Sequence, residues 1–84
     1  MNYIATFYSH FGAMRFKKDL EAIGLSAVLM PVPRYLSSSC GTCASFSADA
    51  LPSVSHTDEI EQIVAMHEED TYEVVFTDSY ASDR

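Results

Sequence analysis

The hydrophobic pattern at the start of the chain predicts a strand followed by a helix. Aromatic and aliphatic residues dominate positions 3–8, as in a strand that ends where Ser9 offers a turn or a helix start. Gly24 is typical of a helix end, so we expect one strand and one helix before it. The helix is indicated by apolar side chains that recur at helical spacing, at Ala13, Phe16, Leu20 and Ile23.

The middle of the chain predicts two further strands with a loop between them. Positions 27–32 form a continuous apolar run too short for a helix, which favours a buried strand parallel to the first one. Two prolines end its regular pairing, and positions 37–41 are expected to form a loop. Positions 42–47 then alternate as a strand, which places Cys43 on the face opposite to the apolar residues.

The second half predicts a helix and a last strand. After a connection at positions 47–55, Ser55 or Thr57 is expected to cap the helix, because acidic residues follow in its first turn. Positions 72–77 alternate as a strand, and the tail at 78–84 is expected to fray. The apolar stripe of the predicted helix consists of Ile60, Ile63, Val64 and His67.

The order of these elements is β-α-β-β-α-β, which favours an α+β fold of the ferredoxin-like type. In that arrangement a four-stranded sheet carries both helices on one face. With 84 residues, of which 48% are hydrophobic, the chain is long enough for one core. We therefore expect a single domain over residues 1–84.

Charge is distributed unevenly along the chain. Residues 1–42 hold four basic and two acidic side chains, whereas residues 43–84 hold one basic and ten acidic side chains, within a net charge of -7. This balance argues against nucleic acid as a partner, because binding nucleic acid needs a basic face. The acidic half favours solubility in general or, as an alternative, an acidic surface that docks a basic protein.

The sequence offers no signal for export or for a membrane. Its start lacks the basic and apolar regions of a signal peptide, and no apolar run approaches the roughly 20 residues that span a bilayer. We therefore expect a cytoplasmic protein without a membrane partner.

Both cysteines, Cys40 and Cys43, lie in one short stretch whose chemistry is distinctive. Between Glu21 and Asp49 the only charged residue is Arg34, so carboxylates are remote from the thiols in sequence and a thiolate is expected to form more easily there. Two cysteines at this spacing in a cytoplasmic protein favour a catalytic, redox or metal-binding role over a structural disulfide.

Geometry leaves several roles open for the pair. Residues three apart in a strand are too distant for a disulfide, so pairing needs a turn, which Gly41 permits. Cys40, Cys43 and His56 match the opening of a zinc finger, but His67 is too far along the chain to be the fourth ligand. We therefore expect no metal and no cofactor.

The neighbours of Cys40 have two interpretations. Arg34 either stabilises a thiolate, a persulfide or a bound anion, or it simply ends a strand at the surface. Ser39 and the serines before it offer hydroxyl and backbone donors for an anion, but they are equally typical of a flexible loop. On the functional interpretation, Arg34, Ser39 and Gly41 contact the substrate.

The segment Pro31-x-Pro33-Arg34 followed by Ser39-Cys40-Gly41 resembles the Pro-x-Pro-Arg and Ser-x-x-Cys-Gly signature of the selenium/sulfur carrier-like family. The resemblance extends over nearly the whole chain. It implies a carrier, rather than a true enzyme, that holds sulfur or selenium on Cys40 as a persulfide or its selenium analogue. The implied partners are a cysteine desulfurase-type donor and an acceptor protein.

Cys43 is not part of that signature, so its role is inferred from chemistry alone. It is expected to act with Cys40 as a catalytic residue by attacking the Cys40 sulfur of the loaded persulfide, which expels the outer sulfur in reduced form, as sulfide, and leaves a Cys40–Cys43 disulfide. Two other classes of function remain open. One is a dithiol redox protein or sensor, and the other is an acidic interaction module in which the cysteines are incidental.

Overall fold

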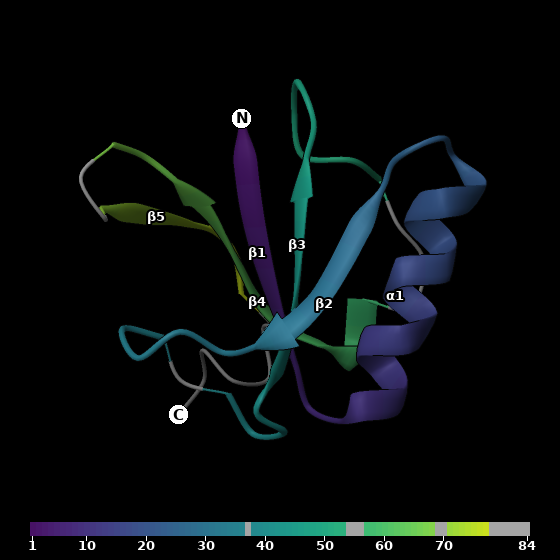
Figure 1. Cartoon of the computed structure of the whole chain (residues 1–84), viewed down its shortest axis with the longest axis horizontal. Helices are drawn as coiled ribbons and strands as arrows, with labels where there is room; N and C mark the ends of the chain where they lie inside the picture. The colour runs from purple at the N-terminus through teal and green to yellow at the C-terminus, as the bar shows by residue number, and fades with distance from the viewer. Residues whose placement is uncertain (37, 54–56, 69–70, 78–84) are drawn as a thin grey trace.

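The structure of the chain, a computed structural model, describes residues 1–36, 38–53, 57–68 and 71–77. Within these residues the chain forms one α-helix, five strands and one turn of 3-10 helix (Figure 1). In chain order the elements are β1 (Asn2–Phe7), α1 (His10–Ala22), β2 (Ala27–Pro31), β3 (Thr42–Ser47), η1 (Thr57–Glu59), β4 (Ile60–Met66) and β5 (Tyr72–Thr77).

The five strands form one sheet in the order β2-β3-β1-β4-β5, and every neighbouring pair is antiparallel. β1 is the central strand, with Tyr3 opposite Phe46 of β3 on one side and opposite Ala65 of β4 on the other. β2 has the same direction as β1, as expected, but β3 lies between them. β2 is therefore an edge strand in which only Ala27 is buried, so the prediction of a buried strand is wrong there.

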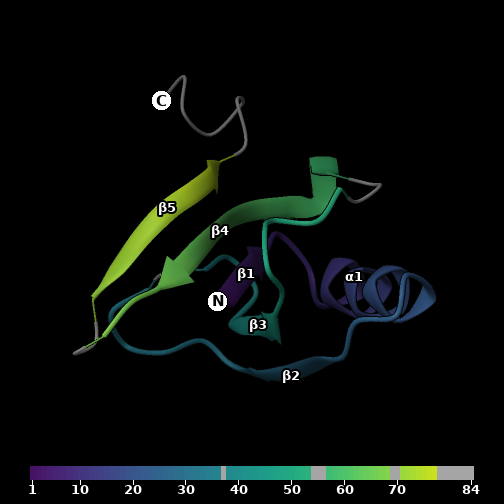
Figure 2. The same cartoon turned by 90° about the horizontal axis from the view of Figure 1, so that it is seen from above.

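Helix α1 forms where the sequence predicts it. Ser9 caps it by accepting a hydrogen bond from the Gly12 amide at 3.1 Å, and Gly24 ends it with a φ of 88°, a conformation that glycine adopts without steric cost. Phe16 packs between Phe7 and Phe46, with ring centroids 5.2 and 5.5 Å away. α1 therefore covers one face of the curved sheet, the helix face (Figure 2).

The opposite face of the sheet, here called the loop face, has its own small core. Ile4, Cys43 and Val64 project from three adjacent strands and are buried together with Leu36. Leu36 belongs to the β2–β3 loop, residues 32–41, and the described part of this loop, 32–36 and 38–41, passes along the side of the sheet away from α1 (Figure 2). The central strands are thus buried on both faces, which explains why five consecutive residues of β1 are inaccessible.

The predicted second helix is wrong, because residues 60–66 form strand β4. A β-bulge explains the error. Thr6 of β1 lies opposite Gln62, whereas the next residue, Phe7, lies opposite Ile60, so Glu61 is an extra residue in β4. The bulge places Ile60 and Ile63 on the same face, and their spacing of three residues imitates a helix.

The predicted α+β class is confirmed, whereas the predicted four strands and two helices differ from the five strands and one α-helix of the described residues. The first four strands lie in the order β4-β1-β3-β2, with α1 on one face, so a ferredoxin-like plan is compatible with this part of the sheet. β5 is an addition at the edge beside β4. The expected cap at Ser55 and the expected frayed tail at 78–84 lie outside the described residues.

Leu20 and Ile23, two of the apolar residues that recur at helical spacing, differ strongly in burial and provide a stability test. Leu20 is fully buried and Ile23 is 56% exposed. Leu20→Ala is expected to lower the free energy of unfolding by about 2–5 kcal/mol, because it leaves a cavity in the helix-face core. Ile23→Ala, the control, is expected to change it by no more than about 0.5 kcal/mol. Urea denaturation measures both, and equal losses would contradict this packing.

Candidate functional site

Backbone hydrogen bonds join the two ends of the β2–β3 loop and form a turn near its start. The Val32 amide donates to the Gly41 carbonyl at 3.1 Å, and the Leu36 amide donates to the Pro33 carbonyl at 3.0 Å, which closes a turn. Arg34 lies exposed in that turn. Within the described part of the chain Arg34 forms no ion pair, so its predicted role beside a thiolate stays a prediction.

Tyr35, the next residue, attaches the far end of the loop to β5. Its ring centroid lies 5.6 Å from that of Tyr72, and the Tyr72 hydroxyl donates to the Tyr35 carbonyl at 3.3 Å. The loop therefore spans the loop face from one edge of the sheet to the other, as the trace from β2 towards β5 shows (Figure 1).

Two serines hold the returning part of the loop against the strands. The Ser38 hydroxyl donates to the Phe7 carbonyl of β1 at 3.2 Å. Ser39 donates twice to the Glu61 carboxylate of β4, from its amide at 3.2 Å and from its hydroxyl at 2.7 Å. These two serines, for which the sequence left an anion site and a flexible loop equally open, are tied to β1 and β4.

Cys40 follows directly and is half-buried. Its thiol donates to the Thr42 carbonyl at 3.4 Å and lies 4.0 Å from the Ser38 hydroxyl. The side chain packs against the core of the helix face. Gly41 then has a φ of 77°, a turn conformation that glycine permits, although the two cysteines stay unpaired.

Cys43 lies in a different environment, although only three residues separate it from Cys40. It is fully buried in the core of the loop face, and its thiol donates to the Pro31 carbonyl at 3.7 Å. Burial raises the pKa of the Cys43 thiol above its ordinary value, and the nearby Cys40 raises it further. The expected orientation of Cys43, opposite to the apolar side chains of β3, agrees with the structure.

The two thiols therefore pack on opposite faces of the sheet, and both are free. A direct reaction between them requires the chain around Gly41 to rearrange, because a disulfide needs Cβ atoms about 4 Å apart with converging directions. In this conformation Cys40 is the cysteine that an external reagent can approach.

Sequence analysis missed two residues near Cys40. Glu61 brings a carboxylate to the residue before Cys40, so the loop is free of acids in sequence but not in space. His10, the first residue of α1, contacts the Thr42 hydroxyl through Nδ1 at 3.2 Å. No local pattern reveals either contact, since each joins residues more than twenty positions apart.

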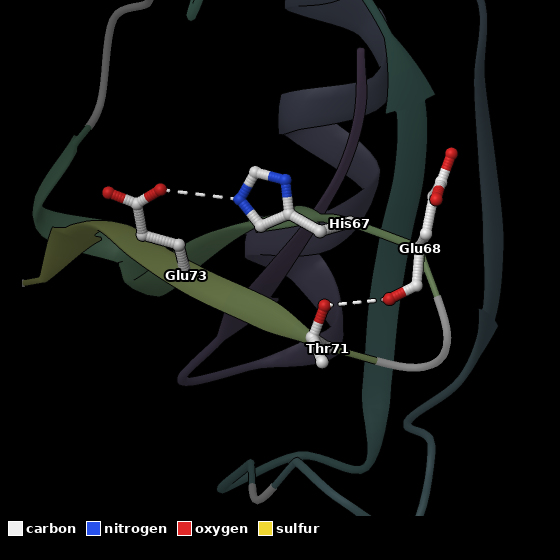
Figure 3. A network of polar contacts seen from close by, with 4 residues as sticks. All are labelled: His67, Glu68, Thr71 and Glu73. Atoms are coloured by element: carbon white, nitrogen blue, oxygen red, sulfur yellow. Dashed lines mark hydrogen bonds and ion pairs between the residues drawn. The ribbon is translucent and has the colours of Figure 1, made fainter.

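His67, expected on a helix, is an exposed residue of the β4–β5 hairpin. Its Nε2 lies 3.3 Å from a Glu73 oxygen, and beside it the Thr71 hydroxyl donates to the Glu68 carbonyl at 2.7 Å (Figure 3). His56 lies outside the described residues. Among the residues that the structure describes, no group of three His, Cys, Asp or Glu side chains is arranged to hold a metal ion.

A surface hollow of about 170 Å³ lies on α1, away from both cysteines in sequence. It is lined by Phe11, Met14, Arg15 and Lys18, and the Arg15 guanidinium lies 4.9 Å from the centre of the Phe11 ring. Lys17 of the same helix pairs with Glu21. Within the described ranges, α1 is too short and too polar to cross a membrane, and no other α-helix is present.

The small antiparallel sheet thus holds two cysteines that differ in access, with Cys40 half-buried in the loop and Cys43 fully buried. The chain matches the family described as "Putative Se/S carrier protein-like" over residues 2–73, and it belongs to that family. The match includes the whole β2–β3 loop with Cys40 and strand β3 with Cys43. No curated protein and no solved structure matches the chain.

The positive φ of Gly41 predicts that the stability of the protein is sensitive to substitution at this position. A Cβ at this position would meet no atom within 4 Å, so the cost of Gly41→Ala comes from the backbone alone. We expect it to destabilise the protein by about 1–2 kcal/mol. Gly41→Asn, a control that tolerates this conformation better, is expected to cost less. Equal stability of the Ala variant and the unchanged protein in urea would contradict the turn geometry.

The burial of Cys43 predicts unequal reactivity of the two thiols. At neutral pH iodoacetamide is expected to modify Cys40 first and to reach Cys43 only when denaturant opens the core. Burial raises the pKa of Cys43, so a smaller fraction of this thiol is ionised at a given pH. Its alkylation rate should therefore rise only at a pH above the ordinary cysteine pKa of about 8.5. Tandem mass spectrometry separates the two sites, and similar rates in the native protein would contradict this assignment.

Proposed function

We propose that this protein carries sulfur or selenium on Cys40, as a persulfide or its selenium analogue, between a donor protein and an acceptor protein. The observation that supports Cys40 is the different burial of the two cysteines. Cys40 is partly accessible on a loop, whereas Cys43 is enclosed in the core of the loop face. Membership of the Se/S carrier-like family supports the kind of cargo.

The proposed loading step is a transfer between two thiols. The Cys40 thiolate attacks the outer sulfur of a donor persulfide, a new sulfur–sulfur bond forms on Cys40, and the bond inside the donor persulfide breaks. The donor cysteine leaves as a thiolate and takes up the proton that Cys40 released. The acceptor later attacks the outer sulfur in the same way, so loading and delivery need no oxidant or reductant.

A thiol that performs this exchange must be accessible and must leave again readily. Cys40 meets the first requirement in part, since it is only half-buried, with its sulfur in contact with the Thr42 carbonyl and the Ser38 hydroxyl. The Ser38 hydroxyl beside the thiol is a suitable donor to the negatively charged outer sulfur of a persulfide once it exchanges its bond to the Phe7 carbonyl for one to the cargo. Ser38 is therefore a further candidate for holding the cargo, beside Arg34, Ser39 and Gly41.

The burial of Cys43 weakens the dithiol alternative. A redox protein or sensor cycles between thiols and a disulfide, and the two sulfurs here pack on opposite faces of the sheet. Release of cargo by Cys43 would meet the same obstacle, so we propose that an external thiol discharges Cys40. The acidic interaction module stays an alternative without a specific observation in its favour.

The carrier role predicts different outcomes for the two cysteine variants. After incubation with a cysteine desulfurase and cysteine, the unchanged protein is expected to gain about 32 Da, the mass of one sulfur atom, and to lose it on reduction with a thiol. Cys43→Ala, the matched control, is expected to load as well. Cys40→Ser is expected to stay unloaded while its circular dichroism and melting temperature remain native.

Intact-protein mass spectrometry decides between the alternatives. A reducible adduct on Cys40→Ser would exclude Cys40 as the carrier. Loss of loading in Cys43→Ala, together with a Cys40–Cys43 disulfide in the unchanged protein, would favour the dithiol redox function instead.

A further inference from the structure

The β-bulge in β4 gives Glu61 an orientation that regular strand alternation would not. Glu61 has no partner of its own in β1, since Phe7 and Thr6 lie opposite Ile60 and Gln62. The extra residue of a bulge leaves the ladder and redirects its side chain, and bulges are common beside functional sites for this reason. Here the redirected side chain is a carboxylate.

That carboxylate holds the residue before Cys40 with both of its oxygens. Oε1 accepts the Ser39 amide hydrogen at 3.2 Å, and Oε2 accepts the Ser39 hydroxyl hydrogen at 2.7 Å. Hydrogen bonds to an ionised acceptor are stronger than neutral ones, and a two-point contact also fixes orientation. We refer to this pair of hydrogen bonds as the Glu61 clamp.

A second contact acts at the same place. The Ser38 hydroxyl donates to the carbonyl of Phe7, the β1 residue opposite the bulge, at 3.2 Å, and the Cys40 amide donates to that hydroxyl at 3.4 Å. Ser38 and Ser39, the two residues before Cys40, are therefore both held at the bulge, Ser38 by Phe7 of β1 and Ser39 by Glu61 of β4. The thiol itself points to the Thr42 carbonyl and stays half-buried.

We propose that Glu61 is a positioning residue for Cys40: its clamp on Ser39 keeps the loop closed, and opening of the clamp gives reagents and partners full access to the thiol. The biological use of the clamp rests on the carrier function proposed above. The clamp itself can be measured on the protein without any sulfur cargo.

The clamp predicts a graded response to substitution. Glu61→Ala removes both hydrogen bonds, Glu61→Gln keeps one good acceptor, and Ser39→Ala keeps the amide donor but loses the hydroxyl. If loop opening limits access to Cys40, the rate of alkylation by iodoacetamide should rise by about two- to tenfold for each hydrogen bond lost. The double variant Ser39→Ala/Glu61→Ala should react no faster than Glu61→Ala alone, because the same contact is removed in both.

Glu73→Ala provides the matched control. It removes a carboxylate of the same β4–β5 hairpin, which contacts His67 instead of the β2–β3 loop (Figure 3), and it changes the net charge equally. We expect the Cys40 alkylation rate of this variant to equal that of the unchanged protein.

Two further readouts separate loop opening from a plain charge effect or from a loss of stability. Opening raises the limiting alkylation rate of Cys40 at high pH, where the thiol is fully ionised, whereas a change of charge alone leaves that limiting rate unchanged. Hydrogen–deuterium exchange should also show faster exchange of the Ser39 amide in Glu61→Ala, with the amides of β1 still protected.

A raised limiting rate in Glu61→Ala, with a smaller rise in Glu61→Gln and none in Glu73→Ala, is the expected result. An unchanged limiting rate, or unchanged exchange of the Ser39 amide, would overturn the clamp. The outcome is independent of the carrier function. If Cys40→Ser still loads sulfur, the carrier proposal fails and the clamp stands, whereas loading on Cys40 with unchanged Glu61 variants refutes the clamp alone.

Discussion

The need to bury the second face of the sheet determines where the two cysteines lie. The described part of the chain supplies one α-helix for five strands, and α1 packs against one face only. Ile4 and Val64 of the two central strands project to the other face, where water contact would cost roughly 1.5–3 kcal/mol for each side chain. Leu36 of the β2–β3 loop shields them, so this loop must lie across the sheet.

This arrangement separates two thiols that are neighbours in sequence. Cys43 projects from β3 into the core that the loop covers, where burial raises the pKa of its thiol and removes it from contact with partners. Cys40 is in the last part of the loop, before Gly41 turns the chain into β3, and it keeps partial access to solvent. A spacing that suggests a dithiol pair therefore gives one buried and one accessible cysteine.

Local patterns were sufficient to predict the elements with regular spacing. The apolar period of α1 and its Gly24 end, the alternation in β3 and β5, and the turn at Gly41 all follow from residues close in sequence. The strand β4 was predicted as a helix because the bulge at Glu61 breaks the two-residue period and aligns Ile60 with Ile63. A bulge depends on the pairing partner, which a single strand sequence does not specify.

The site was predictable in the same limited sense. The short motif around Cys40 identified the loop, but the partners that fix the loop are Glu61 and the carbonyl of Phe7, more than twenty residues away in either direction. The absence of acids near the cysteines in sequence was misleading for the same reason. Contacts of this kind follow from the sheet order and from the bulge, and both became known only with the tertiary structure.

The central claim is that the fold selects Cys40, and not Cys43, as the thiol that meets partners. The most direct measurement is tandem mass spectrometry of the unchanged protein after loading by a cysteine desulfurase. The fragments that matter are those produced by cleavage of the chain between Cys40 and Cys43. The account predicts that the added sulfur, about 32 Da, stays with the fragment that contains Cys40. Sulfur on the fragment that contains Cys43 would contradict it.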